Sequence, residues 1–130
     1  MLVITSLYAS ILALLVIFLA YKVVNFRQTK SVGLGDNGDK DGLRAIRVHA
    51  NAVEYIPMMV ILMGIYEVNG GSSLLLHIIG SVAVIARILH ATGLSKSAGT
   101  TFGRFVGTVL TWLTILVLAG LNIYHFISQL

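Results

Sequence analysis

One stretch of the sequence, from Arg44 to Pro57, carries polar side chains that could bind a ligand, within an otherwise apolar segment. At 100° per residue, four of these side chains fall within about 80° of one another around a helix. They are Arg44, Arg47, Asn51 and Glu54. A charged side chain at the centre of a membrane helix costs about 2.5–3.5 kcal/mol on insertion scales. This face is therefore expected to turn toward protein, water or a polar ligand.

The residue types on this face favour an anionic ligand. Arginine stays charged at any accessible pH, and its planar guanidinium binds a carboxylate or phosphate through two parallel hydrogen bonds. Glu54 adds an acceptor for an ammonium group or an internal partner for Arg47, and Asn51 could instead join two helices. Several cations, one carboxylate and one amide would suit a small zwitterion with extra carboxylates. A nearby arginine would also stabilise a thiolate over a thiol.

The composition is that of an integral membrane protein. Of the 130 residues, 57% are hydrophobic and only 11% are charged, whereas a soluble domain has about 25% charged residues. Several apolar runs reach the roughly 20 residues that span a bilayer. The net charge of +4 does not indicate nucleic-acid binding, because the basic residues lie inside helices or at their ends. The chain has no cysteine, which excludes thiolate zinc sites and cysteine nucleophiles.

Four membrane-spanning helices are expected, at about residues 2–24, 43–68, 74–91 and 101–128. Polar loops separate them, and Pro57 within the second helix favours a kink. The expected fold class is therefore all-α. It is a single domain, residues 1–130, in which the helices form an up-down-up-down transmembrane bundle.

The polar loop before the second helix contains the sequence DNGDKDG, which is similar to part of a calcium-binding loop. Such a loop needs a bidentate glutamate at its twelfth position. That position is Arg47 when counted from Asp36 and Ala50 when counted from Asp39. The loop is therefore expected to be a solvated turn, and no metal site is predicted.

The distribution of basic residues predicts how the bundle crosses the membrane. Lysines and arginines flank the first and third loops, whereas the second loop and both termini have none. By the positive-inside rule, loops one and three are cytoplasmic and both termini lie on the opposite side. This topology brings Arg87 and His90, near the end of the third helix, into the same layer as the polar face of the second. Arg104, near the start of the fourth helix, enters that layer as well.

Two patterns resemble those of the MAPEG family, the membrane-associated proteins in eicosanoid and glutathione metabolism. The pattern RxHxNxxEYxP at residues 47–57 is similar to the signature of that family's second helix. The pattern RxxH at residues 87–90 is similar to that of its third helix. Chain length, four spans and a long first loop also fit, so the resemblance covers essentially the whole chain. It is closest to the short prokaryotic branch, which implies a bacterial inner (plasma) membrane.

The resemblance implies a homotrimer of four-helix subunits that binds glutathione between neighbours near the cytoplasmic side. It favours an enzyme similar to the microsomal glutathione transferases. Such an enzyme would conjugate glutathione to lipophilic electrophiles or reduce lipid hydroperoxides in detoxification. Glutathione would be the co-substrate, and lipophilic small molecules or membrane lipids would be the other partners.

The resemblance also assigns binding residues. Arg47 and Asn51 would hold the carboxylate and backbone groups of glutathione. Glu54 would meet the glutamyl ammonium or the network around it, with Tyr55 beside it. Arg27, at the end of the first helix, matches a basic position of the family.

Four further positions bear on the chemistry that the resemblance implies. In better-known members an arginine near the start of the fourth helix stabilises the thiolate, and Arg104 is the candidate here. His90 falls near a tyrosine that contacts the thiol region in some relatives, and Leu94 replaces a second such tyrosine. Arg87 would either contact the ligand or pair with Glu54 or with a neighbouring subunit.

These replacements keep two other hypotheses open. A non-catalytic lipid-binding or scaffolding member of the same fold could retain the motif without the chemistry. A small proton-coupled drug exporter is also a short four-helix chain, but it depends on an acidic residue deep in the first helix. The sequence has none there, and nearby arginines would hold Glu54 ionised.

Overall fold

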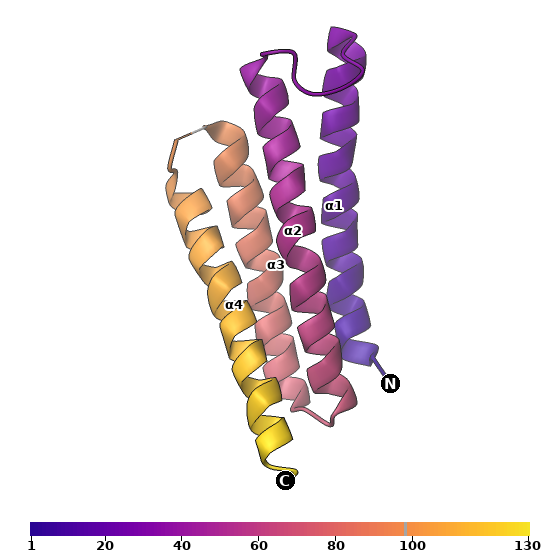
Figure 1. Cartoon of the computed structure of the whole chain (residues 1–130), viewed down its shortest axis with the longest axis vertical. Coiled ribbons are helices and arrows are strands. Elements are labelled where there is room, and N and C mark those ends of the chain that lie inside the picture. The colour runs from indigo at the N-terminus through magenta and orange to yellow at the C-terminus, as the bar shows by residue number, and fades with distance from the viewer. Residues whose placement is uncertain (98) are drawn as a thin grey trace.

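The protein is an all-α bundle of four long helices. The computed structural model describes residues 1–97 and 99–130. The helices are α1 (Val3–Lys30), α2 (Lys40–Val68), α3 (Ser73–Lys96) and α4 (Phe102–Ile127). Figure 1 shows them side by side, with both termini at one end of the bundle. Each helix is long and apolar enough to cross a membrane, so the expected four-span membrane fold is confirmed.

The first helix is longer than expected, because it continues past Val24 to Lys30. The added residues include no glycine or proline, and Arg27 and Lys30 lie in the last turn. Positive charge is favourable there, next to the carbonyl end of the helix dipole. The helix ends at Ser31, whose backbone is left-handed at φ 54° and whose N–H bonds back to carbonyls of the last turn.

The second helix begins at Lys40, earlier than expected, because Asp39 caps it. The Asp39 carboxylate accepts hydrogen bonds from the backbone N–H groups of Gly42 and Asp41, and these bonds hold its pKa below the ordinary value. Asp36 accepts from the Gly38 N–H in the same loop. The acidic residues of the calcium-like sequence therefore stabilise a turn and a helix start.

The third helix also runs further than expected, past Ala91 to Lys96. Gly93 does not end it, because this glycine is a packing contact: a Cβ there would overlap the backbone of Arg104 in α4. A second glycine, Gly107, allows a similar approach, since a Cβ at that position would overlap the backbone of His90. The two glycines therefore hold α3 and α4 close together, beside the polar residues of both helices.

The core consists of two apolar clusters along the bundle axis. One joins α1, α2 and α3 and includes Leu12 and Met59, and the other includes Met63, Leu76 and Leu118, all fully buried. Large apolar side chains such as Leu14 and Leu116 point outward. In a membrane-spanning bundle this outer surface is suited to lipid or to a neighbouring subunit.

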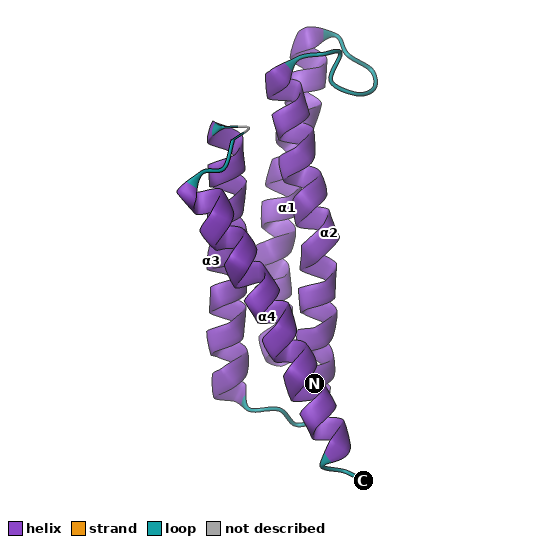
Figure 2. Ribbon diagram, turned by 60° about the vertical axis from the view of Figure 1, so that its left-hand side comes forward, coloured by secondary structure: helices purple, strands orange, loops and turns teal. Residues whose placement is uncertain are grey.

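The two helical hairpins differ in reach. At the end away from the termini, the α1–α2 hairpin projects beyond the α3–α4 hairpin (Figures 1 and 2). This end carries Lys30, Lys40, Arg44, Lys96 and Arg104 and is called the basic end below. The first turns of α2 therefore stand partly free above α3 and α4.

At the opposite end, α2 caps α1. The N-cap position of α1, Leu2, provides no side-chain hydrogen bond. Instead Glu67 accepts from the backbone N–H of Ile4 at 2.8 Å and from that of Thr5 at 2.7 Å, one with each carboxylate oxygen. A carboxylate at the positive end of a helix dipole is favourable. No local pattern in the sequence indicates this contact, because the partners are more than sixty residues apart.

We expect Glu67→Ala to lower the free energy of unfolding by about 1–2 kcal/mol, because two N–H groups of α1 lose their acceptor. Glu67→Gln should cost less, since it keeps one carbonyl oxygen. Melting in detergent, followed by circular dichroism, measures both. Hydrogen exchange at Ile4 and Thr5 should accelerate in the alanine variant and stay unchanged in a Gln129→Ala control. Unaltered exchange at both amides would show that the cap does not hold α1.

Candidate functional site

A cavity of about 460 Å³ opens at the basic end between α2, α3 and α4. This volume lies within the range of about 300–1,000 Å³ that small-molecule sites occupy. Its lining consists of Lys40, Leu43, Arg44, Arg47, Asn51, His90, Leu94 and Arg104. We call it the basic cavity.

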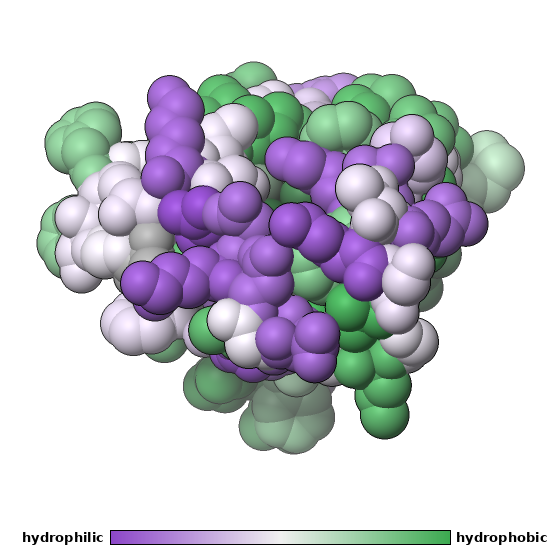
Figure 3. Space-filling model, turned by 90° about the horizontal axis from the view of Figure 1, so that it is seen from above, coloured by the Kyte–Doolittle hydropathy of each residue, from purple (hydrophilic) through white to green (hydrophobic). Residues whose placement is uncertain are grey.

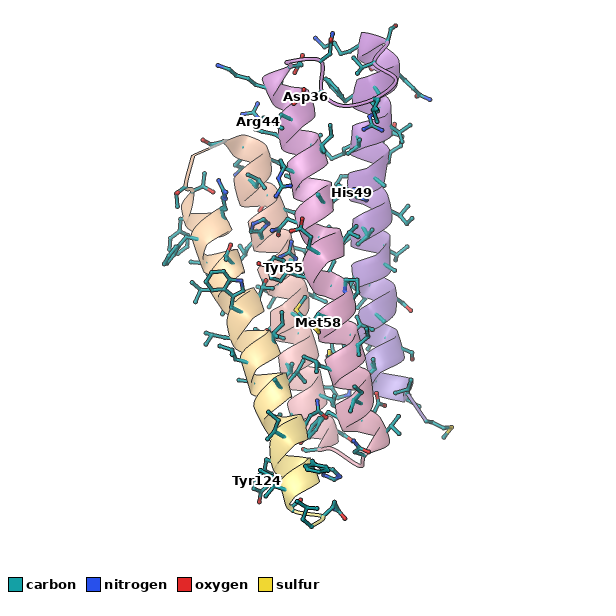
Figure 4. The ribbon with its side chains drawn as sticks, in the orientation of Figure 1. Asp36, Arg44, His49, Tyr55, Met58 and Tyr124 are labelled. Carbon is teal, nitrogen blue, oxygen red and sulfur yellow. The ribbon has the colours of Figure 1, made fainter. Side chains whose placement is uncertain are left out.

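Helical spacing and the unequal hairpins together form this cavity. Lys40, Arg44, Arg47 and Asn51 lie three or four residues apart and so share one face of α2. The α3–α4 hairpin stops below the first turns of α2 (Figure 2), and Arg104, near the start of α4, lines the same cavity as this face. Figure 4 shows Arg44 on the projecting part of α2 and Tyr55 further down the same helix.

The basic cavity is electropositive. Lys40, Arg44, Arg47 and Arg104 line it, and none of its lining residues in the described part of the chain is acidic. Arg44 also pairs with Asp41 outside the cavity lining. The first turn of α4 adds the positive end of its dipole, with Thr101 as the N-cap. Seen from above, hydrophilic residues cover much of the basic end, with apolar residues at the margins (Figure 3).

Below the cavity, a buried guanidinium joins three helices. Arg87 of α3 is only 1% exposed. Its Nη2 donates to Asn51 Oδ1 of α2 at 2.7 Å, and its Nη1 donates to Thr111 Oγ1 of α4 at 3.4 Å. The guanidinium carbon lies 5.7 Å from the centre of the Tyr55 ring, which adds a cation–π contact. The charge is therefore solvated by side chains from both neighbouring helices.

This network fixes the orientation of two side chains that line the cavity. An arginine N–H can only donate, so the Asn51 amide oxygen must face Arg87, which leaves the amide N–H groups for another partner. His90 Nδ1 lies 3.5 Å from Arg87 Nη2 and must accept in that contact. A hydrogen bond in this contact requires an unprotonated Nδ1, which would leave the His90 ring proton on Nε2.

The structure brings together some of the residues expected from the sequence. Arg47, Asn51, His90 and Arg104 all line the basic cavity. Arg87 lies below it and donates to Asn51, and the Tyr55 ring lies against Arg87. The Tyr55 hydroxyl accepts from Trp112 Nε1 at 3.2 Å.

Two further expected residues, Glu54 and Arg27, lie outside the cavity and form no hydrogen bond to Arg87 among the described residues. Glu54 is exposed on the outer side of α2, and no ion pair joins it to Arg47 or Arg87 among the described residues. Arg27 lines a separate shallow hollow at the end of α1 and the first loop, and its Nε is buried without a hydrogen-bond partner in the described structure.

Sequence reasoning missed Lys40 and Thr111. Lys40 was expected to lie in the loop, although its spacing of four residues before Arg44 would place it on the same face of a longer helix. Thr111 lies four residues after Gly107, whose carbonyl accepts its hydroxyl hydrogen bond. Small and hydroxyl residues at this spacing indicate a close-packed helix face in a membrane.

We expect Asn51→Ala to destabilise the fold by about 1–3 kcal/mol, because it leaves the buried Arg87 without its shortest hydrogen bond. In an Arg87→Met background the same change should cost much less, since no donor then remains unpaired. Melting of the wild type, both single variants and the double variant measures this coupling. Additive losses would mean that the two side chains do not act together.

Comparisons with known proteins support the pattern found in the sequence. Residues 5–124 match the MAPEG family. The chain is also 34% identical over 122 residues to the inner membrane protein YecN of Escherichia coli, which covers 94% of this chain and 92% of that relative. YecN from a second strain of the same organism matches to the same extent. The name of this relative gives a location and states no activity.

Proposed function

The chain belongs to the MAPEG family, and we propose that it is a membrane-bound enzyme that uses glutathione. It either conjugates glutathione to lipophilic electrophiles or reduces lipid hydroperoxides with it. The observation that carries this proposal is the basic cavity, in which four cationic side chains and one oriented amide meet beside His90. Glutathione combines two carboxylates, an ammonium and a thiol, so it needs such a set of donors.

The residues of the cavity suit the polar parts of this ligand. Arg47 and Lys40 offer donors for the carboxylates from two levels of α2. Asn51, whose oxygen is held by Arg87, offers its amide N–H groups to a ligand carboxylate or carbonyl. Arg87 is thus a positioning residue, because it acts on the ligand through Asn51.

The chemistry requires a thiolate, which the cavity charge favours. Arg104, at the dipole-positive start of α4, is the residue proposed to stabilise the sulfur anion. In conjugation the sulfur attacks the electrophilic carbon, a C–S bond forms, and the leaving group departs with its bonding electrons. His90, with its proton on Nε2, can donate a hydrogen bond to the departing group.

Hydroperoxide reduction would use the same thiolate. The sulfur attacks the outer peroxide oxygen, an S–O bond forms as the O–O bond breaks, and the lipid leaves as an alcohol after protonation. A second glutathione then displaces the oxygen as water and forms glutathione disulfide. Two electrons from two thiols therefore reduce one peroxide.

The proposal includes a homotrimer with the basic end in the cytoplasm. Glu54 is exposed in the middle of a membrane-spanning helix, where a bare carboxylate facing lipid is unfavourable. A neighbouring subunit would cover it, and could bring its own Arg27 toward the cavity. The concentration of lysine and arginine at the basic end supports the cytoplasmic orientation.

A second candidate function is non-catalytic binding of an anionic lipid or a scaffolding role. One observation favours it: among the described residues that line the cavity, none carries a hydroxyl, and Leu94 stands where the family resemblance expects a tyrosine. The Tyr55 hydroxyl lies outside the lining and is bonded to Trp112. In that case the cavity would bind a lipid phosphate without any thiol turnover.

Glutathione binding tests the first function directly. Isothermal titration of glutathione into the detergent-purified protein should show saturable binding. Arg47→Ala should weaken it about 10–100-fold, the loss expected for a charge-assisted hydrogen bond. Lys96→Ala removes a cation at the basic end but outside the cavity, so it should bind like the wild type. Absence of binding to the folded wild type would refute the proposal, and lipid binding alone would support the second candidate.

The role of Arg104 can be tested by the titration of bound thiol. We expect thiolate absorbance in the complex to appear well below the ordinary thiol pKa of about 8.5. In Arg104→Ala the titration should move back toward that value, whereas Arg104→Lys should retain most of the shift because it keeps the charge. Equal titration in wild type and Arg104→Ala would remove Arg104 from this role.

A further inference from the structure

A second concave surface lies on a different face of the bundle, between α1 and α3. It is a groove of about 300 Å³, and a smaller hollow of about 190 Å³ adjoins it toward the start of α2. The two share Leu19, Lys22 and Ser95, so they form one continuous surface. We call it the α1–α3 groove. Arg44 borders both this hollow and the basic cavity.

The groove is divided along its length into an apolar part and a cationic part. Leu15, Phe18 and Ile88 line the apolar part, and Lys22 and Lys96 lie at the other end. Leu15 precedes Lys22 by seven residues and Ile88 precedes Lys96 by eight, which corresponds to about 10–12 Å along each helix. Both helices run toward the basic end (Figure 1). The two lysines therefore lie at similar depth, above the apolar part.

The two lysines are available to an anion. Both are exposed, and neither forms an ion pair among the described residues. Lys22 Nζ lies 5.7 Å from the centre of the Phe18 ring, so the ammonium is held over the apolar part of the groove. The groove and hollow carry Lys22, Lys96 and Arg44 against one carboxylate, Asp41, which already pairs with Arg44. The charge left for a ligand is positive.

This arrangement matches the profile of a phospholipid. A phosphate at the membrane surface would meet the lysines, and an acyl chain would lie along the apolar surface between α1 and α3. A zwitterionic headgroup brings its own ammonium toward the lysines, and like charges repel, whereas an anionic headgroup such as phosphatidylglycerol carries no ammonium. The charge pattern therefore favours an anionic lipid over a zwitterionic one.

We propose that the α1–α3 groove binds one anionic phospholipid of the surrounding bilayer per subunit, with Lys22 and Lys96 at the phosphate and one acyl chain against Leu15, Phe18 and Ile88. This site shares only Arg44 with the basic cavity and does not depend on glutathione binding. Its occupant would attach the protein to membrane regions rich in anionic lipid.

Native mass spectrometry of the detergent-purified protein, with phosphatidylglycerol and phosphatidylcholine of identical acyl chains, tests this site. We expect phosphatidylglycerol to bind saturably at one lipid per subunit and more tightly than phosphatidylcholine. Each lysine removed should weaken phosphatidylglycerol binding about five-fold, and Lys22→Ala with Lys96→Ala about 25-fold. Lys40→Ala removes the same charge from the basic cavity and should leave the lipid affinity unchanged.

A steric variant separates the groove from general attraction to the basic end. Thr92 is exposed and lines the groove, and its hydroxyl bonds only to carbonyls of its own helix. Thr92→Trp should therefore fold, which circular dichroism checks, and should block both lipids. The proposal is overturned if the two lipids bind equally, if the lysine double variant binds as the wild type does, or if Thr92→Trp leaves binding intact. If a second copy of the chain covers the groove, no lipid will bind there, and this result also overturns the proposal.

Discussion

The hydrogen bond between the buried Arg87 guanidinium and the Asn51 amide is the interaction on which the basic half of the bundle depends. A guanidinium removed from water must donate to protein groups, and here they come from α2 and α4 as well as from α3. These partners lie on three helices, so the bonds of Arg87 tie α2, α3 and α4 together, although its Nε is buried without a partner among the described residues. The same bond orients Asn51 in the cavity lining, so the stability of the fold and the shape of the site have a common cause.

Close packing on one side of this network and open space on the other create the cavity. Gly93 and Gly107 let α3 approach α4 until no room remains for a Cβ. The α1–α2 hairpin instead projects beyond its neighbour and leaves the first turns of α2 uncovered (Figure 2). The polar face of α2, which would be unfavourable in lipid, therefore lies beyond the end of the α3–α4 hairpin. Water and an anionic ligand can reach it there.

The charged side chains at the two ends of the bundle differ in whether they have partners within the chain. At the end with the termini, the Glu67 carboxylate caps the start of α1 and is fully engaged within the chain. At the basic end, Arg47 in the cavity and Lys22 in the α1–α3 groove lie on different faces and form no ion pair among the described residues. Positive charge without an ion-pair partner on these two faces favours two anionic ligands. The basic cavity would bind a small soluble one, and the α1–α3 groove would bind a lipid of the bilayer.

The sequence by itself determined the four spans, the membrane location, the family and the polar face of α2. These depend on the length of apolar runs and on spacing within one helix, which are local properties. Only the tertiary structure decided that Arg87 bonds to Asn51 while Glu54 faces outward, that Arg27 lies away from the cavity, and that Glu67 caps α1. Helical periodicity fixes which residues share a face, but the packing of one helix against another decides what that face meets.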